Sequence, residues 1–297
     1  MPDAPILVIG IGGQLATALA AQAGDLPLAR IGRPELDLAL PETVAPALEK
    51  IRPALVINAA AHTAVDGAES ERGLAWAVNA TGPGAIAAWC GGANVPLLHV
   101  STDYVFDGTK GAPYVETDPP HPTGVYGESK LAGEEAVLAA CPRAAVFRTS
   151  WVISATGRNF VLTMLNAARQ GKRLRVVADQ VGCPTAAADL ADVLLAVARR
   201  ILAGGFQPAW HGVFHAAGTG STSWHGLAAA TFEEAARHGL PQPEVTPITT
   251  ADWPTPVRRP PDSRLDCSRL AATFGLRLPP WRRSLAKIVD QAFAAPG

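Results

Sequence analysis

The chain has 297 residues, of which 48% are hydrophobic and 6% aromatic, and its formal net charge is −1. This length can bury a large core and suggests one or two domains. The near-neutral charge provides no overall basic field, so we expect neither nucleic acid nor a membrane surface as a partner. No apolar run approaches the length that spans a membrane.

Four cysteines, Cys90, Cys141, Cys183 and Cys267, lie far apart in the sequence and form no Cys-x-x-Cys motif. Because isolated thiols of this kind are typical of reducing compartments, the simplest expectation is reduced, buried cysteines. A predicted strand begins almost at the N-terminus, and the pattern of a signal peptide is not seen. These features together predict a cytoplasmic protein.

The first predicted elements are a buried strand, Ile6–Ile9, a glycine-rich turn and an alanine-rich helix that ends near Ala23. Apolar, β-branched runs are typical of buried parallel strands. Gly10, Gly13 and Ala16 match the spacing G-x-x-G-x-x-[GA], in which small residues allow a tight turn, the approach of a pyrophosphate and packing of helix on strand. The helix N-terminus supplies N–H donors for phosphate. The turn therefore predicts a dinucleotide site, with a ligand-free turn as the alternative.

The second predicted strand, Leu26–Ile31, is followed by arginine, and no carboxylate appears before Glu35. In dinucleotide-binding folds an acidic residue at this point binds the ribose 2′-hydroxyl of NAD, whereas arginine accommodates the 2′-phosphate of NADP. Arg33 therefore favours NADPH as the cofactor, with NADH as the second choice. An ordinary exposed arginine is the alternative. Asp37 and Leu38 are placed where they can flank the adenine.

A predicted helix over 41–51 leads to a third strand that runs from Leu55 into small residues. Small side chains such as Ala60 and Ala61 allow a cofactor to lie across the strand ends. One further helix is predicted to start at Asp66 and to carry Trp76, Asn79 and Trp89. The fourth strand, over 97–100, delivers Ser101, Thr102 and Asp103 to the same crevice.

Tyr126 and Lys130 are four residues apart in a predicted helix that runs to Ala140, so their side chains share one face. An ammonium beside a phenol favours phenolate and lowers the tyrosine pKa. Such a phenol can exchange a proton with a substrate oxygen near neutral pH. Thr102 ends the preceding strand, where its hydroxyl can share this oxygen. The alternative is a chance motif in which Lys130 pairs with Glu134 on a solvated face.

Strand and helix alternate as far as a strand over 144–148, at the spacing of βαβ units. The glycine turn, Thr102 and the Tyr126/Lys130 pair all fall at strand ends or helix starts. We therefore predict an α/β fold, a Rossmann-type doubly wound parallel sheet with a smaller C-terminal α/β substrate-binding domain. Residues 1–151 are assigned to dinucleotide binding. Residues 152–297 are assigned mainly to the substrate, partly interleaved with the first domain.

The alternation loosens beyond residue 151. Helices are predicted over 159–170, 185–203, 222–238 and 281–293, and strands over 175–177 and 213–215. His211 and His215 can share one strand face, but a third ligand is not evident, so we predict no metal site. The arginines of the segment 258–264 can either clamp a nucleotide diphosphate or be solvated loop charges.

Several blocks, taken in order, resemble the extended short-chain dehydrogenase/reductases, and more closely the dTDP-4-dehydrorhamnose reductases. The glycine turn and Tyr126-x-x-x-Lys130 are generic to the superfamily, whereas the blocks around Trp151, Gln180 and Pro184 are much more specific to the subgroup. The remaining blocks are 58–69, 101–106, 113–118 and 259–263. The resemblance extends from the first strand to Trp281, nearly the whole chain.

This resemblance implies reduction of dTDP-4-dehydro-β-L-rhamnose to dTDP-L-rhamnose by NAD(P)H, in dTDP-rhamnose biosynthesis. By matching position, Tyr126 is the proton donor, Lys130 its pKa partner and a ribose contact, and Thr102 the third catalytic residue. Thr102, Asp103 and Trp151 are implied to touch the sugar nucleotide. The residues implied to line the cofactor are Gly12, Gly13, Gln14, Leu15, Ala61, Thr63, Tyr126 and Lys130.

The sequence also departs from this family pattern. Some members bind magnesium through carboxylates, and the matching positions here are Ala18 and Ala188. We therefore expect no metal, and a monomer or weak homodimer. Asp262 stands where many relatives have asparagine, and Ile153 replaces a common tyrosine. Neither change removes a catalytic group.

Two other functions stay open at this point. An epimerase or dehydratase that acts on sugar nucleotides uses the same scaffold and retains its NAD. A non-catalytic, cofactor-binding regulatory subunit is the second, although such a protein has no need of both Tyr126 and Lys130.

Overall fold

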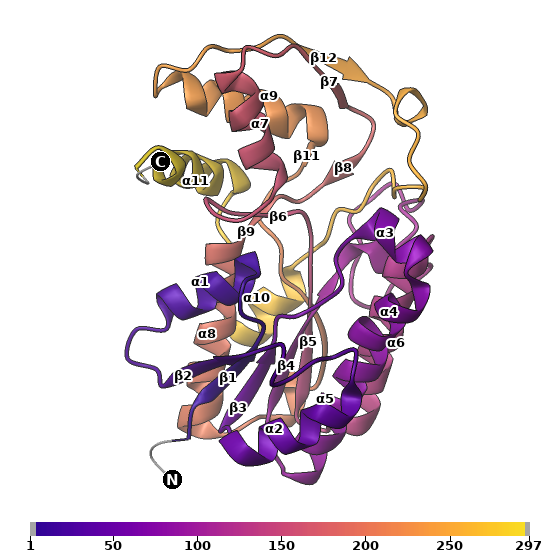
Figure 1. Ribbon diagram of the computed structural model, residues 1–297, viewed down its shortest axis with the longest axis vertical. Coiled ribbons are helices and arrows are strands. Elements are labelled where there is room, and N and C mark those ends of the chain that lie inside the picture. Colours follow the sequence, from indigo (N-terminus) through magenta and orange to yellow (C-terminus); the bar gives the residue numbers. More distant parts are fainter. Residues whose placement is uncertain (1–3, 295–297) are drawn as a thin grey trace.

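The structure is a computed structural model that describes residues 4–294, folded into a larger and a smaller lobe (Figure 1). Within these residues the larger lobe contains a six-stranded sheet in the order β10-β5-β4-β3-β1-β2. The strands are β1 (Ile6–Ile9), β2 (Leu28–Ile31), β3 (Leu55–Asn58), β4 (Leu97–Thr102), β5 (Ala144–Thr149) and β10 (Gly212–His215). All neighbouring pairs are parallel. The predicted doubly wound sheet is confirmed.

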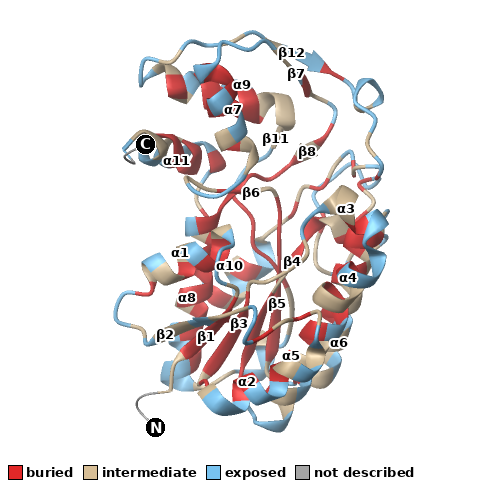
Figure 2. Cartoon of the chain, in the orientation of Figure 1, coloured by how far each residue is buried: buried red, intermediate tan, exposed pale blue. Residues whose placement is uncertain are grey.

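Helices cover both faces of this sheet, which explains its continuous apolar strands. One face packs on α1 (Gln14–Gln22), α8 (Ala187–Gly204) and α10 (Ser268–Phe274), and the other on α2 (Val44–Ile51), α5 (Gly82–Gly92) and α6 (Val125–Ala140). In β1, Ile6 and Val8 face the first group of helices, whereas Leu7 and Ile9 face the second. Figure 2 shows β1, β3, β4 and β5 as a buried layer between these helices, whereas the edge strand β2 is partly exposed.

The strand order reverses between β1 and β3, because β2 lies on one side of β1 and β3 on the other. Crevices at such a reversal, outside the carboxyl ends of the strands, are where doubly wound sheets bind ligands. The fold therefore brings the glycine turn after β1 beside the small residues after β3.

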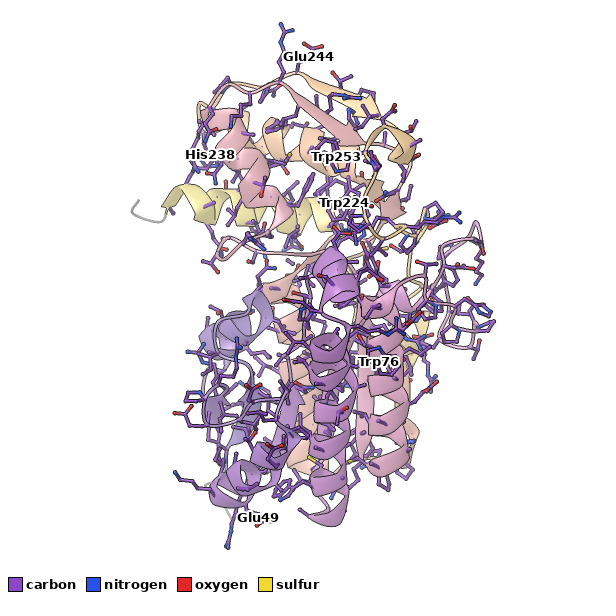
Figure 3. All side chains as sticks on the ribbon, turned by 45° about the vertical axis from the view of Figure 1, so that its right-hand side comes forward. Glu49, Trp76, Trp224, His238, Glu244 and Trp253 are labelled. Atoms are coloured by element: carbon purple, nitrogen blue, oxygen red, sulfur yellow. The ribbon has the colours of Figure 1, made fainter. Side chains whose placement is uncertain are left out.

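The smaller lobe has a core of its own that includes Leu165, Leu227 and Leu285. Its helices are α7 (Phe160–Arg169), α9 (Trp224–Ala236) and α11 (Trp281–Ala294), and its paired strands are β6 (Val152–Ile153) with β9 (Thr185–Ala186), β7 (Leu174–Val177) with β12 (Val245–Ile248), and β8 (Val181–Gly182) with β11 (Thr222–Ser223). Figure 3 places Trp224 and Trp253 in this lobe and Glu49 and Trp76 in the larger one. The chain returns to the larger lobe with α8, β10 and α10.

The long helix predicted from Asp66 is broken in the structure, so that prediction is wrong. The segment forms α3 (Val65–Ser70), α4 (Arg72–Trp76) and a π-helical turn, Ala77–Thr81, before α5. Glu71 leaves the helical conformation, with a φ of −111°. The strand β12 was not predicted, because the segment over 240–261 is dominated by proline and threonine, which mask the pattern of regular structure. The helix α10, of seven residues, was not predicted either.

None of the helices between residues 4 and 294 combines the length and the apolar character that a membrane-spanning segment needs.

The π-helical turn packs against α6 at a glycine. A Cβ added to Gly133 would lie 2.0 Å from the Asn79 carbonyl oxygen. We expect Gly133→Ala to lower the free energy of unfolding by about 1–3 kcal/mol, because backbone must move apart to admit the methyl group. The measurement is urea unfolding. Gly73→Ala is the control, since Gly73 lies in α4 with no neighbour close to an added Cβ, and its stability should be unchanged or higher. Equal stability of the two variants would contradict the packing described.

Candidate active site

A cavity of about 950 Å³ lies beside the carboxyl ends of β1, β3 and β4. Its size suits a cofactor-sized ligand. Every residue assigned to the cofactor from the sequence lies in its wall, namely Gly10, Gly12, Gly13, Gln14, Leu15, Arg33, Ala60, Ala61, Thr63, Tyr126 and Lys130. Asp37 and Leu38 lie there too. Thr102, Asp103 and Trp151 are outside this wall, although Ser101 and Thr149, which precede them, are part of it.

The glycine turn has the backbone that a phosphate cradle needs. Gly10 has a φ of +129°, which glycine adopts without strain, and a Cβ there would lie 3.3 Å from that of buried Ala16. Gly13 provides no side-chain cap for α1, so the first N–H groups of the helix are left for a ligand. Arg30 fixes the turn from β2, with Nη1 donating to the Ile11 carbonyl at 2.9 Å. These features fit a bound pyrophosphate.

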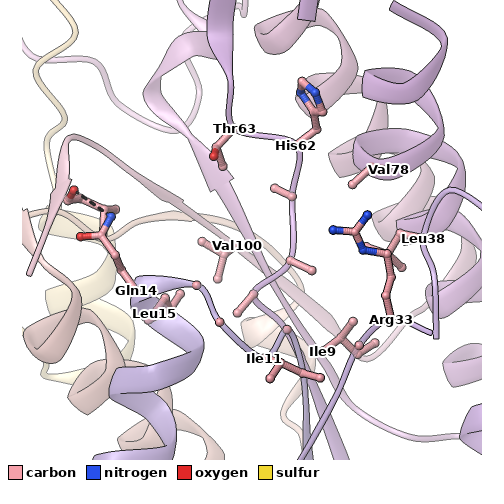
Figure 4. Close-up of a pocket in the computed structure, with 18 of the residues that line it drawn as sticks. Ile9, Ile11, Gln14, Leu15, Arg33, Leu38, His62, Thr63, Val78 and Val100 are labelled. Carbon is pink, nitrogen blue, oxygen red and sulfur yellow. Dashed lines mark hydrogen bonds between the residues drawn. The ribbon is translucent and has the colours of Figure 1, made fainter. Parts of the chain in front are cut away.

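Arg33 follows β2 and turns its guanidinium into the cavity beside Leu38 and Val78 (Figure 4). Its side chain is exposed. No ion pair within residues 4–294 involves it. A planar cation of this kind at the edge of the cavity suits a phosphate group.

The small residues after β3 are held by two buried asparagines. Asn79, in the π-helical turn, accepts from the His62 N–H at 2.8 Å and donates to the His62 carbonyl at 3.0 Å. It also donates to Ser129 Oγ of α6 at 3.1 Å. Asn58 Oδ1 accepts from the Ala60 N–H at 3.2 Å. The cavity wall is therefore tied to the helix that carries Tyr126.

The Lys130 side chain is buried against β4 rather than placed on a solvated face of α6. Its side chain is 1% exposed, and Nζ donates to the Val100 carbonyl of β4 at 2.7 Å. Glu134 pairs instead with Arg148, at 2.6 Å. The alternative in which Lys130 and Glu134 form a surface pair is wrong. Tyr126 is also buried.

The pKa values of Tyr126 and Lys130 differ from those expected from the sequence. Burial raises the pKa of Tyr126 well above its ordinary value, and a hydrogen bond with Thr102 opposes this rise. Burial lowers the pKa of Lys130 to about 8, and the Glu134 charge opposes that fall. The prediction that Lys130 depresses the Tyr126 pKa is therefore wrong for the chain alone, because desolvation outweighs charge here. The phenol is protonated at neutral pH, which is the form a proton donor requires.

Thr102 and Asp103 form a buried polar cluster next to Tyr126. Thr102 Oγ1 donates to Asp103 Oδ1 at 3.2 Å and Ser150 Oγ donates to Oδ2 at 2.8 Å. Burial raises the pKa of Asp103 to about 6, against the hydrogen bonds from Ser263, Ser150 and Thr102. The carboxylate thus sets the direction of the Thr102 hydroxyl.

Trp151 marks the passage from β5 into the smaller lobe. Its φ of +46° lies in the left-handed region, which is uncommon for a bulky residue. The ring stacks on Trp224 with centroids 3.6 Å apart and planes 7° apart. A Cβ on Gly182 would lie 2.4 Å from the Trp151 ring. The position of this aromatic pair therefore depends on glycine at 182.

The arginines of the segment 258–264 were expected either to clamp a nucleotide diphosphate or to be solvated loop charges, and the structure matches neither alternative fully. Arg259 Nη2 lies 2.6 Å from Asp66 Oδ2 of α3, and Arg264 Nη2 lies 2.6 Å from Asp262 Oδ2. Both are therefore held by carboxylates of the chain. Arg259 joins this segment to the larger lobe.

Three of the histidines near the sheet, His62, His99 and His215, have structural partners. His62 lines the cavity and lies 2.9 Å from Glu71. His99 lies 3.1 Å from Asn58, and burial puts its pKa well below the ordinary value. His215 Nδ1 lies 3.1 Å from the Tyr114 carbonyl. Within residues 4–294 no group of three or more His, Cys, Asp or Glu side chains could hold a metal ion, and Ala18 and Ala188 offer no ligand atoms.

Sequence reasoning missed several wall residues that come from the smaller lobe, namely Val152, Gly157 and Arg158. Gln14 reaches this lobe, with Oε1 accepting from Ser154 Oγ at 2.8 Å. Its Nε2 donates to the Val152 carbonyl at 3.5 Å (Figure 4). The one sequence feature that could have predicted this contribution is Arg158, a basic residue that follows Gly157 in a turn-rich segment. Arg158 adds a third cation to the wall, after Arg33 and Lys130.

Comparisons with known proteins agree with this geometry. The RmlD substrate binding domain family matches residues 4–293. A dTDP-4-dehydrorhamnose reductase of Sinorhizobium fredii is 46% identical over 285 residues, which cover 96% of each chain.

Two solved structures are similar over nearly the whole chain. A dTDP-4-dehydrorhamnose reductase from Clostridium acetobutylicum has a TM-score of 0.89 and 35% identity, and covers 96% of this chain and 98% of its own. One from Bacillus anthracis, solved in complex with NADP, has a TM-score of 0.88 and 30% identity, and covers 97% and 99%.

The stacked tryptophans give a spectroscopic prediction. Gly182→Ala should displace the Trp151 ring from Trp224, because the added Cβ overlaps the indole. We expect the near-ultraviolet circular dichroism band of the stacked pair to weaken while the far-ultraviolet spectrum stays the same. Trp253→Phe is the control, since Trp253 is exposed and should contribute little. An unchanged near-ultraviolet band in Gly182→Ala would contradict the stacking.

Proposed function

Because the chain belongs to the RmlD substrate binding domain family, we propose that it reduces dTDP-4-dehydro-β-L-rhamnose to dTDP-L-rhamnose. The reductant is NADPH, with NADH as the second choice. The enzyme is an NAD(P)H-dependent oxidoreductase of dTDP-rhamnose biosynthesis.

One observation carries this proposal beyond the family match. A protonated, buried phenol, Tyr126, and a buried ammonium, Lys130, lie together in the wall of a cavity built for a dinucleotide. Reduction of a ketone needs both a hydride and a proton. The wall of this cavity offers the proton donor next to the place for the cofactor.

The chain fits the cofactor through residues already described. The glycine turn and the N-terminus of α1 would hold the pyrophosphate, and Arg33 the 2′-phosphate. Ala60, Ala61 and Thr63 would lie along the rest of the dinucleotide, with Lys130 at the ribose. When bound, NADPH supplies the hydride that reduces C4 of the sugar.

The remaining steps belong to the protein. Tyr126 donates its proton to the C4 oxygen of the sugar as the carbonyl is reduced. Lys130 stabilises the phenolate that forms, and Thr102 shares the negative charge that develops on the oxygen. Thr102, Asp103 and Trp151 would contact the sugar nucleotide.

The smaller lobe, formed mainly from residues 152–297, is proposed to hold the substrate against the cavity. Its aromatic pair, Trp151 and Trp224, stands where the chain passes between lobes. The free cysteines of residues 4–294 support a cytoplasmic enzyme. We infer a monomer or weak homodimer, since Ala18 and Ala188 stand at the positions where some family members carry magnesium-binding carboxylates.

The reaction is tested by oxidation of NADPH in the presence of dTDP-4-dehydro-L-rhamnose. We expect turnover that EDTA leaves unchanged. Tyr126→Phe should lower kcat by about a hundredfold to ten-thousandfold, because the proton donor is lost, while NADPH binding, measured by fluorescence, stays nearly intact.

Tyr114→Phe is the matched control. Its phenol donates to Asp107 outside the cavity wall, and turnover should be retained. Full activity in Tyr126→Phe would refute the assigned donor. No turnover of the natural chain, despite NADPH binding, would refute the proposed reaction.

Cofactor choice is tested at Arg33. Arg33→Ser should raise the KM for NADPH by about tenfold, since a charge-assisted contact to phosphate is lost. The KM for NADH should change little, because that cofactor has no 2′-phosphate. Steady-state kinetics with both cofactors on the same variant provides an internal control. Equal changes for the two cofactors would show that Arg33 does not select NADPH.

A further inference from the structure

Glu134 and Arg148 form the one ion pair within residues 4–294 in which both side chains are buried, with 3% and 4% exposed. Arg148 Nε donates to both Glu134 oxygens, at 2.9 and 3.1 Å, and Nη2 donates to Oε2 at 2.6 Å. The guanidinium also lies over the Phe106 ring, 5.1 Å from its centroid. The carboxylate is therefore fixed in place.

This pair lies beside the proposed active site. Glu134 follows Lys130 by four residues on α6, so both side chains project from one face of the helix. Arg148 on β5 is in register with Ser101 on β4, and Lys130 bonds to Val100, the preceding residue of β4. The ion pair and the lysine thus join α6 to neighbouring positions of the same two strands.

Stability alone does not account for this arrangement. A buried ion pair contributes little more than apolar side chains of the same size, because desolvation of two charges offsets their attraction. A pair of leucines or methionines would join α6 to β5 equally well. The carboxylate differs from such residues in its charge, which acts on a nearby buried ammonium.

We propose that Glu134, fixed by Arg148, is a positioning residue of the active site, whose negative charge keeps buried Lys130 protonated and in place next to Tyr126. The catalytic importance of Glu134 rests on the proposed function. The effect of Glu134 on the charge of Lys130 does not.

The other groups around Lys130 do not supply this charge. His99 on β4 is neutral at neutral pH, since burial puts its pKa well below the ordinary value, and Tyr126 on α6 is a neutral phenol. Asp103 is held by Thr102 and Ser150, and of the carboxylates it is Glu134, not Asp103, whose charge raises the pKa of Lys130. Burial lowers the pKa of Lys130 to about 8, and the charge that opposes this is that of Glu134.

Lysine loses its charge as the pH rises through its pKa. Removal of the Glu134 charge lowers that pKa further, so Lys130 becomes neutral at a lower pH. Loss of one opposite charge from the next turn of the same helix corresponds to a shift of about one pH unit.

The chain is suited to a direct test because it contains five lysines, Lys50, Lys110, Lys130, Lys172 and Lys287. The full chain, labelled with ¹³C at the lysine ε-carbon, is titrated by NMR, and Lys130→Arg assigns the resonance. We expect the Lys130 midpoint to lie about one pH unit lower in Glu134→Gln than in the natural chain. Glu135→Gln removes an exposed carboxylate from the next position and should leave the midpoint unchanged. An unchanged midpoint in Glu134→Gln would overturn the proposal.

A second variant keeps the test decisive if Glu134→Gln does not fold, since that change leaves Arg148 buried without its partner. Glu134→Gln combined with Arg148→Met removes both charges, and we expect it to fold. Of these two charges only that of Glu134 acts on the pKa of Lys130, so the Lys130 midpoint should still be lowered. A midpoint equal to that of the natural chain would mean that the pair only supports the fold, and the proposal would be wrong.

The titration needs no substrate, so its outcome is independent of the proposed reduction. Where the natural chain turns over, kcat of Glu134→Gln at pH 8 should fall about fivefold, which is the loss of the charged fraction for a one-unit shift. Failure of turnover in the natural chain would refute the reaction. An unshifted lysine midpoint would refute the role of Glu134.

Discussion

The hydrogen bond from Lys130 Nζ to the Val100 carbonyl is the contact on which the site depends. It joins α6 to the carboxyl end of β4 and holds an ammonium where only 1% of the residue is exposed. A buried ammonium is unfavourable by several kcal/mol unless partners replace its lost hydration. The carbonyl is available because parallel strands end at the crevice, and the charge of Glu134 offsets part of the remaining cost.

Close packing of α6 makes this contact geometrically possible. Added Cβ atoms at Gly127 and Gly133 would lie 2.2 Å from the Tyr104 carbonyl oxygen and 2.0 Å from that of Asn79. Glycine within a helix costs about 1 kcal/mol relative to alanine. The helix therefore gives up intrinsic stability in order to lie against the backbone on both sides. Tyr126, directly before Gly127, is brought to the end of β4 by the same approach.

Local sequence patterns correctly predicted the first strand, the glycine turn and the placement of Tyr126 and Lys130 on one helix. The apolar run before Gly10, the glycine spacing and the four-residue separation of Tyr126 and Lys130 each follow from short-range rules. Features that depend on tertiary contact were not predictable: the π-helical turn at Asn79 arises where α6 approaches, and Arg158 reaches the cavity from the other lobe. The prediction of a lowered Tyr126 pKa failed for the same reason. Desolvation depends on burial, and burial cannot be read from the spacing of residues in the sequence.

The raised pKa of Tyr126 also fixes when Lys130 acts. With the phenol protonated in the resting site, the ammonium has no charge on Tyr126 to stabilise before the reaction. Negative charge appears on the phenol oxygen only as its proton leaves for the substrate. An interaction that is stronger in the transition state than before it lowers the barrier, whereas one that is equal in both does not. A buried lysine beside a neutral phenol therefore meets the condition for catalysis better than a lysine that has already formed the phenolate, provided that Lys130 itself remains charged.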